Sequence, residues 1–240
     1  MKIIDLTCPL ELDYGLPYFT LKPNSYEWSI ARTVERDSCM LSKLTMSTHC
    51  ATHIDAPMHV FTRSEKEGIF SVDEWPLEQL YGDTVVLDIP KKELEEITAD
   101  DFDKAKPEVR EGDIVLVHTG WGRYYVEDKK GSEYLTNKRP GFVTSAAEWL
   151  VKKKVKALGS DVLVTNHAKY QFLPYPEEAT SGADRGHEPV HEILLGNDII
   201  LIEQLINLDK IKGRRVTAGF FPLNIKGLDG CPIRALAFVD

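Results

Sequence analysis

The eleven-residue segment from His49 to His59 constrains this chain more than any other part of it, because it holds three histidines and an aspartate. Imidazoles and carboxylates that crowd together without an apolar reason for burial indicate a divalent metal site. Pro57 argues against an uninterrupted helix there. The spacing of four puts His49 and His53 on one helical face or brings them together across a tight turn, and the alternative is a polar loop whose histidines occur by chance. Asp55 and His59 favour the metal site.

Two further residues with metal-binding side chains lie far downstream. Glu203 ends an apolar strand predicted at 198–203, where a buried carboxylate is costly unless it is neutralised. A metal would neutralise it, and so would an arginine such as Arg214 or Arg234, so the sequence leaves this choice open. His191 falls in a short predicted helix and could equally be an exposed helix residue.

Length and composition are those of an ordinary globular protein. The chain has 240 residues, 42% hydrophobic and 28% charged, which fits a single domain over 1–240. The net charge of −9 makes nucleic acid and anionic membranes poor partners. The four cysteines form no C-x-x-C pair, and no apolar segment is long enough for a signal peptide or a membrane span. We therefore expect a cytoplasmic protein with reduced cysteines.

Predicted strands outnumber predicted helices and alternate with them irregularly, which favours a mixed α/β or α+β fold over a regular doubly wound sheet. Capping-box patterns at Thr98–Asp101 and Ser145–Glu148 predict two helix starts, and the second helix is expected to reach about Lys156. A third helix is expected at about 188–195. Strands are predicted at 2–6, 27–33, 39–47, 84–89, 113–118, 156–164, 198–203, 215–221 and 233–239. The segments 126–141 and 170–186 are predicted loops that could act as lids.

The segment from His49 to His59 resembles the H-x-G-T-H-x-D-x-P-x-H signature of the cyclase family, which includes bacterial kynurenine formamidases and isatin hydrolases. The resemblance covers nearly the whole chain. Other segments similar to the family are Ile3–Thr7, Thr119–Trp121, Gly159–Asp161, His191–Leu195, Ile202–Glu203, Asn207–Leu208 and Pro232–Ala237. The resemblance implies a swivelling β/β/α type of fold and a homodimer or homotetramer.

The resemblance also implies the roles of the site residues. His49, His53 and Asp55 match one group of metal ligands, with Asp55 able to bridge two ions. His191 and Glu203 match a second group, and His59 matches the histidine assigned to acid–base work. Mixed imidazole and carboxylate ligands suit zinc, which we expect, and also manganese.

The function implied is hydrolysis of a carbon–nitrogen (amide) bond by metal-activated water, in an arylformamidase acting on an N-formylkynurenine type of substrate. An isatin hydrolase-like cyclic amidase and a non-catalytic metal-binding protein are the alternatives. Ala51 departs from the family glycine, so the turn there needs a permissive backbone angle. Val164 and Asn166 stand where the family often has Ser and Asp, which leaves the substrate contacts of that strand open.

Several loop residues could contact an aromatic, charged substrate. Core or interface packing is the simpler interpretation of the aromatic residues, and a solvated surface position is the simpler interpretation of the arginine. These residues are Tyr18, Phe19, Trp75, Trp121, Tyr170, Phe172 and Arg185.

Overall fold

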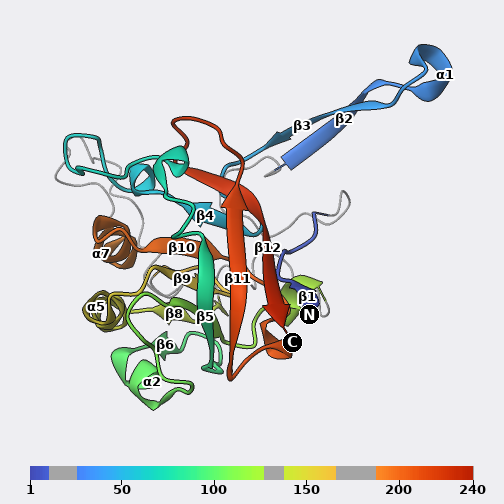
Figure 1. Cartoon of the computed structure of the whole chain (residues 1–240). Helices are drawn as coiled ribbons and strands as arrows, with labels where there is room; N and C mark the ends of the chain where they lie inside the picture. Colours follow the sequence, from blue (N-terminus) through green and yellow to red (C-terminus); the bar gives the residue numbers. More distant parts are fainter. Residues whose placement is uncertain (11–25, 127–137, 166–187, 240) are drawn as a thin grey trace.

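The computed structural model describes residues 1–10, 26–126, 138–165 and 188–239, and a barrel-like sheet dominates it (Figure 1). Eight strands follow the order β1-β12-β11-β5-β7-β9-β10-β4, and β4 also pairs with β12. This second pairing closes a ring of seven strands, with β1 attached to β12. The strands are β1 (Lys2–Asp5), β4 (His53–Asp55), β5 (Tyr81–Asp88), β7 (Ile114–His118), β9 (Ala157–Ser160), β10 (Ile200–Glu203), β11 (Arg214–Pro222) and β12 (Gly230–Val239).

Four strands of the ring, β5, β7, β9 and β10, run parallel to one another, and the other pairings are antiparallel. The helices α2 (Ala99–Lys104), α5 (Thr144–Lys153) and α7 (Pro189–Gly196) lie along one side of this sheet (Figure 1). A doubly wound sheet would carry helices on both faces. The predicted mixed α/β class is therefore confirmed.

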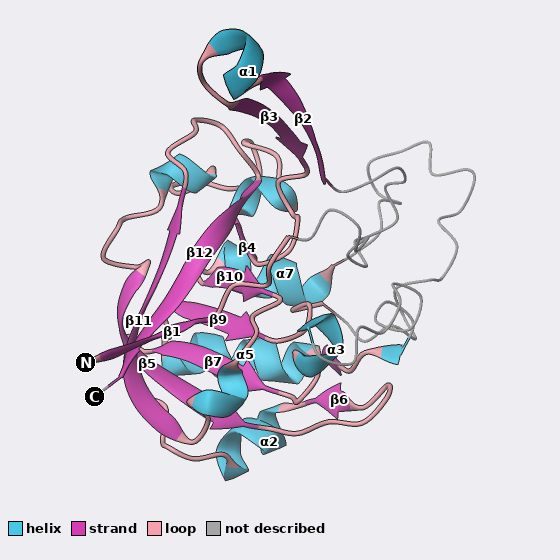
Figure 2. Ribbon diagram, turned by 90° about the vertical axis from the view of Figure 1, so that its right-hand side faces the viewer, coloured by secondary structure: helices cyan, strands magenta, loops and turns pink. Residues whose placement is uncertain are grey.

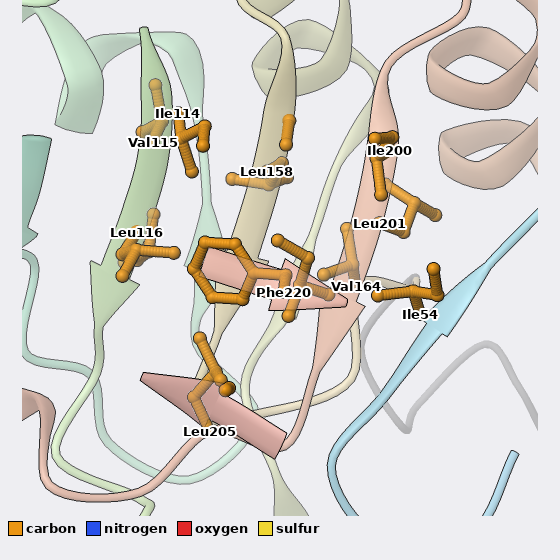
Figure 3. Packing of buried hydrophobic residues seen from close by; sticks show 14 of the residues in the cluster. Ile54, Ile114, Val115, Leu116, Leu158, Val164, Ile200, Leu201, Leu205 and Phe220 are labelled. Carbon is orange, nitrogen blue, oxygen red and sulfur yellow. The ribbon is translucent and has the colours of Figure 1, made fainter. Parts of the chain in front are cut away.

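Apolar side chains of the parallel strands pack inside the ring and under the helices. Ile114, Val115, Leu116 and Val117 of β7 are all fully buried, as expected for a strand covered on both faces. Figure 3 shows residues from several strands, including Leu158, Ile200, Phe220 and Ile54, meeting in this core.

Most predicted elements are confirmed, with three corrections. The capping box at Thr98 and Asp101 is present at the start of α2. The second predicted capping box is wrong, because α5 begins one residue before Ser145 and its N-cap, Val143, has no side-chain oxygen to offer. Ser145 Oγ instead accepts a hydrogen bond from Ala99 N at 3.4 Å.

The strand predicted at 156–164 is shorter than expected and ends at Ser160. The helix predicted to reach about Lys156 ends at Lys153, where Lys154 takes a left-handed backbone conformation (φ 54°). The predicted loop at 126–141 lies largely outside the described residues, and the predicted loop at 170–186 lies entirely outside them.

A two-stranded ribbon of β2 (Tyr26–Arg32) and β3 (Leu41–Met46) projects from the body with α1 (Val34–Asp37) at its tip (Figures 1 and 2). Trp28 and Leu44 pair across it, and both are exposed. The strand β3 ends three residues before His49, so the ribbon leads directly into the histidine-rich segment.

The smaller elements are β6 (Glu96–Ile97) paired with β8 (Gly141–Phe142), α3 (Arg123–Val126), and the 3-10 helices η1 (Pro57–His59), η2 (Val72–Glu74) and η3 (Leu208–Lys210). Among the described residues, no helix combines the length and apolar character that crossing a membrane requires.

Candidate metal centre

The short strand β4 is the foundation of the candidate site, because its side chains alternate between the site and the core. Ile54 is fully buried among apolar residues, while His53 and Asp55 project from the opposite face. The register places His53 directly across from Glu203, the last residue of β10. One sheet face therefore brings together His53, Asp55 and Glu203, although Glu203 lies 150 residues after His53 in the sequence.

The turn that precedes β4 fixes the orientation of His53. Ala51 has φ 55°, in the left-handed region that favours glycine, so the permissive angle expected from the sequence is confirmed. In this conformation the Ala51 carbonyl contacts His53 Nδ1 at 2.7 Å. Thr52 Oγ1 accepts from Cys8 N at 2.8 Å and donates to the Gln204 carbonyl at 2.7 Å. These bonds tie the turn to Cys8 and to Gln204, the residue after β10, and leave His53 Nε2 facing the two carboxylates.

Four side chains converge at the centre of the site. His53 Nε2 lies 3.3 Å from Asp55 Oδ1 and 3.6 Å from Glu203 Oε2. His191 reaches in from α7, with its Nε2 3.4 Å from Asp55 Oδ2 and 3.7 Å from Glu203 Oε1. All four residues are buried. The structure thus brings His191 inward, and the exposed-helix interpretation of this residue is wrong.

Neither arginine proposed from the sequence to neutralise Glu203 does so. Arg234 pairs with Asp5, with Nε 3.0 Å from Oδ1. Arg214 is an exposed residue at the start of β11. Groups that interact with Glu203 include the two imidazoles and the backbone N–H of Val164, which donates to Oε1 at 2.7 Å. A third arginine, buried Arg139, also interacts electrostatically with Glu203.

The electrostatics of this cluster fit a bound cation. Burial and the charge of Asp55 both raise the pKa of Glu203. Burial alone would raise the pKa of Asp55 as well, but His53 and His49 lower it well below its ordinary value. Asp55 Oδ2 is buried and accepts no hydrogen bond from the described residues. An unbonded carboxylate oxygen among imidazoles and a second carboxylate is the donor set that divalent zinc or manganese would satisfy.

His49 joins the cluster from the turn and touches two carboxylates. Its Nδ1 lies 2.8 Å from Asp55 Oδ1, and its Nε2 lies 2.8 Å from Asp229 Oδ2. Burial alone would lower the pKa of His49, but Asp55 and Asp229 outweigh it and raise the pKa to about 10. The two carboxylates therefore favour a positive charge on the His49 ring.

His59 lies at the rim of the site. His59 is the last residue of η1, and its backbone N–H donates to the Ala56 carbonyl at 2.9 Å, which holds this turn in place. Its ring centroid is 4.0 Å from that of His49 and 5.6 Å from that of His191. The side chain is about one-third exposed, so it can exchange protons with solvent while it faces the cluster. The structure therefore places all six residues singled out in the sequence in one cluster.

Two residues at the site were missed by sequence reasoning. Asp229 precedes β12 and contacts His49. Arg139 is almost completely buried, and its Nη2 donates to Thr165 Oγ1 at 2.6 Å. Thr165 follows Val164, whose N–H binds Glu203, so Arg139 braces the segment that orients this carboxylate. No periodic pattern marks either residue, since each acts through a contact made only in the folded chain.

The segments around residues 119 and 159, which resemble the family, form one structural unit. Buried Asp161 accepts hydrogen bonds from Thr119 N and Oγ1, from Gly120 N and from Gly122 N, at 2.6–3.2 Å. This carboxylate therefore fixes the loop that follows β7 against the end of β9.

The loop residues considered for substrate contact divide into two groups. Trp75 and Trp121 are buried in the core, and Trp121 Nε1 donates to the Lys91 carbonyl at 3.0 Å, so the core interpretation holds for both. The other residues lie outside the described part of the chain. They are Tyr18, Phe19, Asn166, Tyr170, Phe172 and Arg185.

Comparison with known proteins places this site in a family. The sequence profile described as "Putative cyclase" matches residues 4–167, about two-thirds of the chain. The chain is 25% identical over 205 residues to an isatin hydrolase of Roseibium aggregatum, covering 82% of this chain and 73% of that protein. It is 26% identical over 212 residues to a kynurenine formamidase of Salinibacter ruber, covering 88% and 85%. The chain therefore belongs to the putative cyclase family, and its relatives include an isatin hydrolase and a kynurenine formamidase.

Solved structures agree with this assignment. Isatin hydrolase A from Labrenzia aggregata shares the fold, with a TM-score of 0.79 at 24% identity over 99% of this chain and 93% of that one. A structure described as a potential metal-dependent hydrolase with cyclase activity gives a TM-score of 0.69 at 28% identity, covering 98% and 96%. The family and fold expected from the sequence are both confirmed.

Proposed function

We propose that this protein hydrolyses the amide bond of an aryl formamide, as an arylformamidase acting on an N-formylkynurenine type of substrate. One observation carries the proposal: His49, His53, Asp55, His191 and Glu203 converge around Asp55 Oδ2, a buried carboxylate oxygen that accepts no hydrogen bond within the described part of the chain, and His59 lies beside them. These five residues would hold one or two divalent ions. The relative named kynurenine formamidase supports this choice of substrate.

Different residues of the site would bind the cation, orient its ligands and transfer protons during hydrolysis. A bound divalent cation lowers the pKa of water toward neutrality and polarises a carbonyl oxygen. Asp55 and Glu203 supply the negative charge that retains the cation, and the Ala51 carbonyl and Val164 N–H keep His53 and Glu203 aimed at it. His59, exposed at the rim, would accept the proton of the attacking water and return it to the leaving nitrogen.

A cyclic amide is the second candidate substrate, since an isatin hydrolase is among the relatives and both substrates place an aromatic ring beside an amide carbonyl. We propose zinc as the native metal, with manganese as the alternative, because imidazoles outnumber carboxylates among the five ligands. A homodimer or homotetramer in the cytoplasm remains our expectation, and sedimentation of the purified protein measures the subunit count.

The test is a panel of formyl anilides, isatin and other cyclic amides, assayed with the apo protein and after loading with zinc or manganese. We expect turnover of a formyl anilide that depends on the metal and disappears after chelation. Turnover of isatin alone would replace the first substrate by the second. Tight metal binding without turnover of any amide would instead support a non-catalytic metal-binding protein.

A further inference from the structure

Asp229 joins the site from the far end of the chain, on the loop that leads into β12. Its backbone is fixed, because the Asp229 carbonyl accepts from Ala56 N at 2.9 Å and the next residue, Gly230, lies opposite Asp55 in the sheet. Its side chain is about one-third exposed. One oxygen, Oδ2, lies 2.8 Å from His49 Nε2 and 3.8 Å from His59 Nδ1. A single carboxylate thus faces two histidines of the site.

The two nitrogens of the His49 ring face different surroundings. Nδ1 points toward buried Asp55, and Nε2 points toward partly exposed Asp229. A histidine that binds a metal through one nitrogen usually donates its other N–H to a carboxylate or carbonyl, which fixes the tautomer and the ring orientation. His53 already follows this pattern, since its Nδ1 is held by the Ala51 carbonyl while Nε2 faces the carboxylates.

We propose that Asp229 is the positioning residue that holds the proton of His49 on Nε2, so that Nδ1 is directed at the metal beside Asp55. The same carboxylate limits where the His59 ring can lie, because Oδ2 also faces His59 Nδ1. Asp229 is then a partner of the ligands and not a ligand. This inference rests on the proposed metal site.

Gly230, the residue after Asp229, also confines the ring of His49. A Cβ atom at Gly230 would lie 2.6 Å from His49 Cε1 and 3.0 Å from each ring nitrogen. The Asp229–Gly230 segment therefore acts as one unit, in which the glycine leaves room for the ring and the aspartate sets its rotation.

The test compares metal binding by the apo forms of the wild type, Asp229→Ala and Asp229→Asn, titrated calorimetrically with zinc and with manganese. Losing a partner of this type typically weakens metal affinity about 10–100-fold. We expect a loss of that size for Asp229→Ala and a smaller loss for Asp229→Asn, whose amide oxygen can still accept from Nε2. Metal stoichiometry should stay that of the wild type.

Asp73→Ala is the matched control. Asp73 Oδ1 binds Gly227 N at 2.9 Å and so braces the same loop, but its hydrogen bonds go to Gly227 and Ser71, not to a histidine. We expect this variant to bind metal as the wild type does. Nitrogen NMR of the zinc-loaded wild type should show His49 protonated at Nε2.

Each contrary outcome has a separate meaning. Wild-type protein that binds neither metal would remove the proposed function together with this inference. Wild-type protein that binds metal while Asp229→Ala binds it within twofold would overturn only the role of Asp229. Loss of a whole equivalent of metal in the variant would make Asp229 a ligand and also overturn it. If Asp229→Ala does not fold, Asp229→Leu, whose side chain is close to aspartate in shape and has no acceptor, decides on the same criteria.

Discussion

Gly230→Ala is the perturbation that most sharply tests the geometry of the site. Gly230 lies opposite Asp55 in the sheet, and an added Cβ would come within 2.6 Å of His49 Cε1. Carbon atoms in good contact lie about 3.5–4.0 Å apart. The His49 ring must therefore move by about 1 Å, and its partly exposed position lets it move outward.

A displacement of this size should damage the site far more than the fold. Functional groups need to be held within about 0.5 Å of the productive geometry, and a misplacement of about 1 Å can cost on the order of 10²-fold in rate. We expect kcat/KM to fall by about that factor and metal affinity to fall about tenfold or more. Overpacking costs about 1–3 kcal/mol of stability, and the freedom of the ring should keep the loss near the lower end.

The assays are calorimetric metal titration, steady-state kinetics on the active substrate of the panel, and thermal unfolding of the apo protein. Gly196→Ala is the control. It adds a Cβ to α7, the helix that carries His191, but this Cβ would approach Phe61 no closer than 3.4 Å, so we expect no change at the site. Gly230→Ala protein that retains wild-type metal affinity and wild-type kcat/KM would refute the placement of His49.

Three further predictions concern single residues of the site and of α2. His59→Ala should keep its metal and lose about 10²–10⁴-fold in turnover, as metal analysis and kinetics will show; full turnover by the metal-loaded variant would contradict the role of His59. Ala51→Gly should raise the unfolding free energy by up to about 1 kcal/mol, because a left-handed alanine costs about 1–2 kcal/mol. The added freedom of glycine in the unfolded chain offsets part of this gain. Denaturant unfolding measures the change, and a lower unfolding free energy in the variant would contradict the prediction. Asp101→Asn should cost about 1 kcal/mol at neutral pH. Burial opposes ionisation of Asp101, but Lys91 and Thr98 lower its pKa overall, so its stabilising effect is present above the pKa of an unfolded aspartate and is lost as pH falls below roughly 4. The unfolding free energies of the wild type and Asp101→Asn should therefore become equal in acid. A difference that persists there would contradict the stabilising role of ionised Asp101.

The sequence predicted the strands well because most of them carry continuous apolar segments that only a covered strand explains. Segments 84–89 and 113–118 correspond to β5 and β7, which lie side by side in parallel inside the sheet. The closing of the sheet could not be predicted in the same way. It depends on β4 pairing with both β10 and β12, and β4 has only three residues.

The candidate site shows the same division. The histidine-rich segment was evident because its residues are close in sequence, and the family resemblance supplied His191 and Glu203. Asp229 and Arg139 have no such signal, since the first acts on a histidine 180 residues away and the second acts through Thr165. The need for glycine at residue 159 is also visible only in the fold, because a Cβ there would lie 2.5 Å from Leu116 Cδ2.

A crystal structure of the protein grown with zinc or manganese, with the ion located by its anomalous scattering, tests the metal centre most directly. The account predicts an ion ligated by both Asp55 and Glu203, with His53 and His191 also bound to it. Anomalous density found elsewhere, or Asp55 and Glu203 turned toward separate pockets around an ion, would contradict it.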